Sequence, residues 1–145
     1  MKKSQLKRNS YLLFTGIFIA TMILTLPSCS HKLTFQNSSV VPAASGSVKI
    51  KKTNNDNYYV NVKTLHLAKP ENLTPPKKVY VVWMRTEDNN VRNIGMIKSS
   101  SGFLSNTLKG ELKATATSKP TSIFITAEND GNTQYPGNQV VIQTK

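Results

Sequence analysis

The sequence is poor in the side chains that carry most catalytic and metal chemistry. Its 145 residues include one cysteine, two histidines, one tryptophan and seven acidic residues. A single cysteine excludes an intramolecular disulfide and any metal cluster held by several cysteines. Zinc and copper sites use three or four His, Cys or carboxylate ligands at fixed spacings, and the sequence offers no such set. We therefore predict a domain that needs no cofactor and no metal ion.

Activated nucleophiles are equally scarce. A catalytic serine needs a neighbouring base. His66 is the one realistic base, because His31 lies in a polar segment, residues 30–47, that is expected to be flexible. No serine occurs in a G-x-S-x-G turn, and the acidic residues fall mostly in predicted turns. The sequence thus predicts a protein that is not an enzyme, with a hydrolase site around His66 as the alternative.

The first 28 residues form three zones that are typical of an export signal. Lys2, Lys3, Lys7 and Arg8 make a basic start, and residues 11–26 are apolar and uncharged. This apolar run is shorter than the roughly 20 residues that a membrane-spanning helix needs. We therefore expect residues 1–28 to be a signal peptide.

The signal ends in Leu26-Pro27-Ser28-Cys29, an apolar residue and two further residues followed by cysteine. This motif resembles the lipobox of bacterial lipoproteins. The resemblance implies cleavage before Cys29 and a diacylglyceryl thioether on its sulfur. The alternatives are an uncleaved anchor helix and a cleaved signal without lipid. We expect a protein of the bacterial cell envelope held to a membrane through Cys29, on the periplasmic side of the outer membrane, with no nucleic-acid partner.

The rest of the chain divides into a short segment and one domain. Residues 29–46 comprise the predicted lipidated cysteine and a small, polar stretch expected to be a flexible tether, with a first edge strand at about 34–41 as the alternative. Residues 47–145 are long enough for one core. Beyond the signal, 15 basic residues face seven acidic ones, a net charge of about +8. Because the lysines are scattered along the sequence, we expect them to be solvated on outer strand faces. Alternatively, the excess positive charge binds an anionic envelope polymer, an anionic lipid or a protein partner.

Alternation of apolar and polar residues predicts short β-strands separated by turns. The nearly continuous apolar run Val79–Thr86 is typical of a strand covered on both faces or central in a sheet, and Gly95 marks a candidate bulge or site of close backbone approach. No segment after residue 30 has a helical period. The sequence thus predicts an antiparallel β-sandwich of immunoglobulin or fibronectin type III character with about seven strands, and a small barrel is the alternative. The strands are expected at about 48–51, 58–66, 79–86, 91–98, 103–112, 122–128 and 139–144.

Four aromatic residues stand out. Trp83 lies within the central strand, where a buried core position is expected. Tyr58 and Tyr59 are adjacent on a strand, so their side chains point to opposite faces and one of them is expected outside. Tyr80 has the same ambiguity relative to Trp83. We predict a possible binding surface for sugar or peptide that includes Tyr58, Tyr59 and Tyr80.

Five short motifs follow one another from Tyr80 to the last strand: 80–84 (YVVWM), 94–97 (IGMI), 125–128 (ITAE), 136–137 (PG) and 140–142 (VVI). In this order they resemble the extracytoplasmic C-terminal domain of anti-sigma-K factors. The resemblance covers about half the chain and implies an immunoglobulin-like sandwich without catalytic residues. The helical sigma-binding segment and the retained membrane helix of those regulators are not recognisable in this sequence.

The nearest likeness is to small lipoproteins of Bacteroidetes type built around such a domain. We therefore expect an interaction or sensing module, and an accessory regulator of an extracytoplasmic sigma-factor system is the further alternative.

The anchor can be tested directly. If Cys29 carries the lipid, Cys29→Ser should abolish labelling with radioactive palmitate and block cleavage at this position, because the thioether forms on the cysteine sulfur. Labelling in cells followed by gel electrophoresis measures both effects. Palmitate labelling that persists in the Cys29→Ser protein would show that the lipid, if any, is elsewhere.

Overall fold

The structure is a computed structural model and describes residues 30–102 and 105–145. The predicted signal peptide and Cys29 lie outside the described residues. The described chain forms one short 3-10 helix, η1 (Pro70–Asn72), and nine strands: β1 (Ser30–Thr34), β2 (Ser45–Lys52), β3 (Tyr58–Leu65), β4 (Val79–Thr86), β5 (Val91–Met96), β6 (Lys98–Gly102), β7 (Ser105–Ala116), β8 (Pro120–Glu128) and β9 (Val140–Gln143). Within these ranges, no helix is long and apolar enough to cross a membrane.

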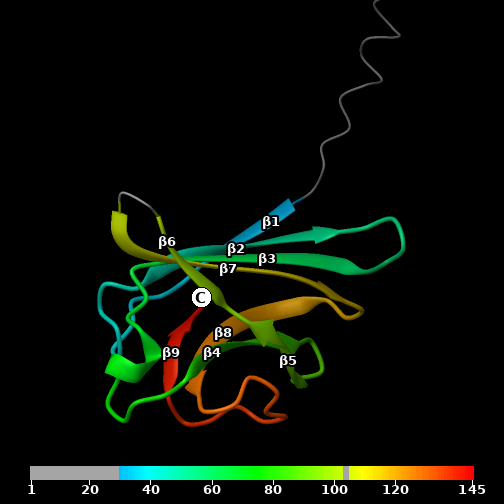
Figure 1. Cartoon of the computed structure of the whole chain (residues 1–145). Coiled ribbons are helices and arrows are strands. Elements are labelled where there is room, and N and C mark those ends of the chain that lie inside the picture. Colours follow the sequence, from blue (N-terminus) through cyan, green and yellow to red (C-terminus); the bar gives the residue numbers. More distant parts are fainter. Residues whose placement is uncertain (1–29, 103–104) are drawn as a thin grey trace, which may run out of the picture.

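The strands form two antiparallel sheets that lie face to face (Figure 1). The first sheet has the order β1-β2-β3-β7-β6, and the second has the order β5-β4-β8-β9. The prediction of an all-β fold with a sandwich-like arrangement is thus confirmed. The described residues contain nine strands rather than about seven, because the expected tether contributes β1 and the region of residues 98–116 forms two strands.

The main core fills the space between the sheets. Period-two alternation turns every second side chain of β2, β3, β4 and β8 toward the opposite sheet. These side chains are almost all β-branched or large and apolar, so they fill the interior with few polar groups that need partners. The buried residues that these four strands contribute to the main core include Val48, Ile50, Val60, Val62, Tyr80, Val82, Met84, Ile123 and Ile125.

The segment expected to be a flexible tether is part of the sandwich. Its residues Ser30–Thr34 pair with β2, and the Gln36 amide donates to the Gln143 carbonyl of β9 at 2.8 Å. This segment therefore closes one open edge between the two sheets. Its polar composition suggested a flexible segment, yet its backbone pairs with strands of both sheets.

Ser38 is a buried polar residue of this segment, and its side chain has internal partners. Its hydroxyl donates to the Val141 carbonyl and accepts from the Val41 amide. Val41 and Ala44 are 7% and 6% exposed and join the main core. Residues 30–46 therefore belong to the folded domain, and the boundary predicted at residue 47 is wrong.

A second apolar cluster lies on the outer face of the second sheet. It contains Val81, Trp83 and Phe124, and the rings of Trp83 and Phe124 stack with centroids 6.3 Å apart. These side chains point away from the main core because they alternate with Val82 and Ile125 along β4 and β8. Trp83 is fully buried, but it lies outside the space between the sheets where the sequence placed the core.

The segment 129–139 covers this outer face. In Figure 1 it forms the orange loop after β8, on the side of the second sheet that is turned away from the first. The Asn93 side-chain amide holds it by donating to the carbonyls of Gly131 at 2.9 Å and Thr133 at 3.0 Å. Both faces of β4 are thereby removed from solvent, which explains the unbroken apolar run in its sequence.

The role of residues 30–46 can be measured. The fragment Ser30–Lys145 contains every described strand and should fold alone, whereas Ser47–Lys145 should lose about 3 to 5 kcal/mol of unfolding free energy because it lacks the buried Val41 and Ala44. Urea titration followed by Trp83 fluorescence gives both values. In the longer fragment, Ser38→Ala should cost about 1 to 3 kcal/mol by leaving buried backbone groups unpaired. Equal stability of the two fragments would restore the tether interpretation.

Candidate binding cleft

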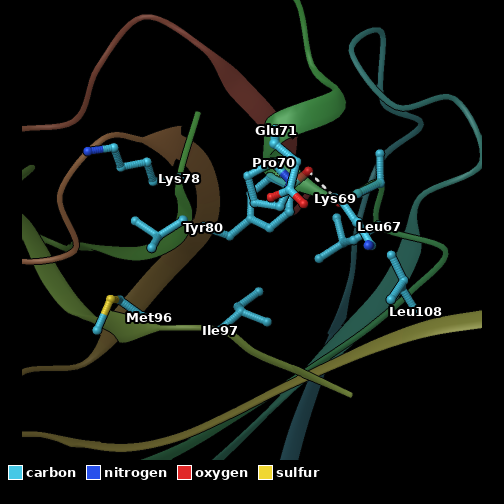
Figure 2. A pocket seen from close by; sticks show the side chains of 11 residues that line it. Leu67, Lys69, Pro70, Glu71, Lys78, Tyr80, Met96, Ile97 and Leu108 are labelled. Atoms are coloured by element: carbon cyan, nitrogen blue, oxygen red, sulfur yellow. Dashed lines mark hydrogen bonds between the residues drawn. The ribbon is translucent and has the colours of Figure 1, made fainter. Parts of the chain in front are cut away.

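A cleft of about 400 Å³ opens where the chain passes from the second sheet back to the first. It is lined by four separate segments: residues 67–71 after β3, residues 78–80 at the start of β4, Met96 and Ile97 at the end of β5, and Leu108 of β7 (Figure 2). Most of these residues are apolar. Clefts of this size and character are usual for small ligands and for single anchoring side chains of a partner protein.

A β-bulge directs the chain into this cleft. The pairing of β5 with β4 shifts register between Val82 and Trp83, and Gly95 has a φ of +129° on the β5 side. This backbone conformation is costly for any residue with a side chain, so glycine is required there. The bulge predicted at Gly95 is present, and it lies directly before the two cleft residues Met96 and Ile97.

Tyr80 anchors the inner wall of the cleft. It is 4% exposed, and its hydroxyl donates to the Ala68 carbonyl at 2.9 Å, while its own carbonyl accepts from the Ile97 amide at 3.0 Å. Burial raises the pKa of Tyr80 to about 12, since the phenolate would lose its hydration. Tyr80 thus fixes the segment 67–71 and belongs to the core, so the expectation that it lies on an exposed binding surface is wrong.

Charged side chains stand at the rim. Lys69, Glu71 and Lys78 are exposed, and Figure 2 shows Lys78 on one side of Tyr80 and Lys69 toward the other. Two backbone hydrogen bonds hold the segments that carry these side chains. The Lys77 amide donates to the Pro70 carbonyl at 3.0 Å, and the Lys78 amide donates to the Glu128 carbonyl at 2.9 Å. An apolar floor with two cations and one anion at its edge suits an apolar group that carries a negative charge nearby.

The buried carboxylate of Glu128 has a structural role. Trp83 Nε1 donates to Thr126 Oγ1 at 2.8 Å, and Thr126 Oγ1 in turn donates to Glu128 Oε1 at 2.5 Å. The Gly137 amide donates to the same carboxylate oxygen at 2.7 Å. This chain of hydrogen bonds fastens the segment 129–139 over Trp83. Oε1 of Glu128 is therefore committed to two neighbouring groups, and the Glu128 side chain is buried.

The remaining sequence-predicted residues do not form one site. Tyr58 packs against the edge of the main core, whereas Tyr59 lies on the outer face of the first sheet, half-buried. His66 is exposed at the end of β3, where its backbone φ is +58°. Among the described residues, no group of three or more His, Cys, Asp or Glu side chains is placed to hold a metal ion. Sequence reasoning missed the cleft, because its lining comes from four segments that only the tertiary structure brings together.

The fold and the cleft define the class of molecule: an all-β sandwich domain with a lateral, mainly apolar cleft. Comparisons with protein-family models, with curated proteins and with solved structures found no match. The function is therefore inferred from the residues of the chain itself.

The buried phenol of Tyr80 predicts a specific loss of stability at high pH. Below pH 10, Tyr80 keeps its proton in both the folded and the unfolded state. Between pH 10 and about 12, the unfolded chain loses this proton first, so the free energy of unfolding falls by roughly 2 kcal/mol. Tyr80→Phe cannot ionise and should lack this component, while losing about 1 kcal/mol at neutral pH with its hydrogen bond. Urea titrations of both proteins across this range measure the difference, and parallel curves would contradict the assignment.

Proposed function

We propose that this chain is a lipid-anchored protein of the bacterial envelope and that its sandwich is a non-catalytic binding module for another envelope component. The observation that carries the proposal is the 400 Å³ cleft, with its apolar lining and two lysines at the rim. We infer an extended protein segment as the ligand, with an apolar side chain for the floor and an acidic group for Lys69 and Lys78.

The construction of the cleft supports binding rather than chemistry. Its described lining contains no histidine, serine or cysteine, and its one carboxylate, Glu71, is exposed at the rim. A general acid or base needs a second group within hydrogen-bond reach of the substrate, in surroundings that adjust its pKa. His66 precedes the cleft residue Leu67 but is itself exposed at a strand end. The alternative of a hydrolase around His66 thus has less support.

The positions of the motifs support an immunoglobulin-like sandwich similar to the C-terminal domain of anti-sigma-K factors. Residues 80–84, 125–128 and 140–142 lie on β4, β8 and β9, and residues 94–97 span the end of β5, so four motifs belong to the second sheet or continue from it. The fifth, Pro136-Gly137, holds the covering segment to Glu128. The position of the tryptophan differs from that in antibody-type domains. Their tryptophan packs between the sheets, whereas Trp83 packs on the outer face of the second sheet.

The anchor is the second part of the proposal. Cys29 directly precedes Ser30, the first residue of β1, so a lipid on Cys29 would hold the domain at the membrane surface with almost no spacer. A partner that binds the cleft would then be a membrane-associated or periplasmic protein.

Site-specific crosslinking in intact cells tests the cleft. A photoreactive amino acid at Met96, which lines the cleft and is 44% exposed, should give a defined adduct that is identified by mass spectrometry. Val140 on β9 is 39% exposed and outside the described lining of this cleft, so the same probe there is the matched control. Lys78→Glu should weaken the Met96 adduct several-fold by reversing the charge at the rim. The proposal fails if Met96 gives no adduct, or if the adduct forms equally at Val140 and is insensitive to Lys78→Glu.

A further inference from the structure

One face of the molecule concentrates its positive charge. Alternation turns the buried residues of β2 and β3 toward the main core and their neighbours toward solvent, on the outer face of the first sheet. Strand register aligns the exposed residues of β1, β2, β3 and β7 across this face. Six exposed lysines occupy it, and together they are called the lysine face: Lys32, Lys49, Lys51, Lys63, Lys109 and Lys113.

The acidic residues are distributed differently. Glu111 shares the lysine face and lies 3.5 Å from Lys113 Nζ and 4.0 Å from Lys63 Nζ. The other six acidic residues lie in turns, in η1 or at the end of β8 and the loop after it: Asp56, Glu71, Glu87, Asp88, Glu128 and Asp130. With six lysines against one glutamate, the lysine face accounts for about +5 of the net charge of about +8 that follows residue 28. Lysines that are scattered in sequence thus lie on outer strand faces, as expected, and the strand register gathers six of them on one face.

The arrangement has an energetic cost. Lys32 and Lys49 are directly opposite each other on β1 and β2, and the same row continues through Asn61 to Lys113. Adjacent strands are about 4.8 Å apart, and like charges at directly opposed positions destabilise a sheet. Glu111 pairs only at a solvent-exposed position, where ion pairs contribute little. An external layer of negative charge would relieve this repulsion.

The lysine face has the form of an interfacial surface. It is the outer face of a sheet, and Tyr59 and Leu65 lie among its lysines, with Leu65 40% exposed. Tyrosine is enriched where a protein meets lipid headgroups, because its ring is apolar and its hydroxyl is polar. The edge strand β1 belongs to the same sheet, and its first residue, Ser30, lies opposite Lys51 (Figure 1). The chain therefore enters the domain at this sheet.

We propose that the lysine face docks on anionic phospholipid headgroups. This binding surface is separate from the cleft and is carried by the folded domain itself, without the lipid on Cys29. It goes beyond the proposed function by specifying which face the domain presents to the membrane. Lysines near an anionic bilayer are attracted strongly at low salt, and the attraction falls within a Debye length, about 8 Å at 0.15 M salt and 3 Å at 1 M.

Vesicle sedimentation tests the proposal with the fragment Ser30–Lys145, which contains every described strand, its fold first checked by circular dichroism. The fragment should bind vesicles that contain phosphatidylglycerol, should not bind pure phosphatidylcholine vesicles, and should be released in 1 M NaCl. Equal binding to both lipids, or binding that survives 1 M NaCl, would overturn an electrostatic dock.

Matched triple variants separate the lysine face from net charge. Lys32→Gln, Lys49→Gln and Lys113→Gln together remove one row of the face and should lower the partition coefficient about a hundredfold, at roughly fivefold per lysine. Lys77→Gln, Arg92→Gln and Lys119→Gln remove the same charge elsewhere and should lower it less than threefold. The first variant should melt at the same temperature as the parent or higher, since it removes the opposed Lys32 and Lys49 charges.

Three further results would overturn the proposal. Equal losses in the two triple variants would show that only net charge matters. Absence of binding to phosphatidylglycerol vesicles would exclude a lipid dock. Tight binding to a soluble polyanion such as dextran sulfate, with none to vesicles, would assign the lysine face to an anionic polymer. None of these results affects the Met96 crosslinking test, so failure of the dock and failure of the cleft proposal are distinguishable.

Discussion

The burial of both faces of β4 is the constraint on which this structure depends. Its inward residues Val82 and Met84 pack between the sheets, and its outward residues Val81 and Trp83 pack beneath the segment 129–139. An uncovered Trp83 would expose a large aromatic surface, so the covering segment and the hydrogen bonds that hold it through Glu128 are required by the sequence of β4. The second sheet is therefore closed on both sides by the chain itself.

The first sheet is constructed in the opposite way. Its inner face supplies Val48, Ile50, Val60 and Val62 to the core, and its outer face carries lysines and has no covering segment among the described residues. The molecule therefore has two unlike sides, one sealed by its own loop and one left charged. A protein that needed solubility alone would gain more from interspersed charges of both signs. The asymmetry is the physical basis for proposing that the charged side has a partner.

The sequence predicted the local features and missed those that depend on register. Alternation around Val48 and the apolar run of β4 identified strands correctly because each reflects how many faces of the strand are buried. Gly95 was recognisable because a positive φ selects glycine. The alignment of Lys32 with Lys49 and Lys113 requires the pairing of four strands, which no single segment encodes. Residues 30–46 were wrongly predicted to be a flexible tether because small residues such as Ser38 and Ala44 give no hydrophobic signal in the sequence. In the structure both are buried, and the Ser38 hydroxyl bonds to β9.

The cleft and the lysine face are compatible with one orientation on a membrane. With the first sheet against the headgroups, β1 and its first residue Ser30 belong to the sheet on the membrane side, and the segment 129–139 lies on the opposite side of the molecule. The cleft is lined by segments that run between the two sheets, and its described lining contains none of the six lysines of the lysine face. Because Lys69 and Lys78 lie at the rim of the cleft and not on the lysine face, an acidic partner would reach them without displacing lipid. Docking would thus reduce the orientations available to the domain while leaving its cleft free, which lowers the entropic cost of binding a partner at the same membrane.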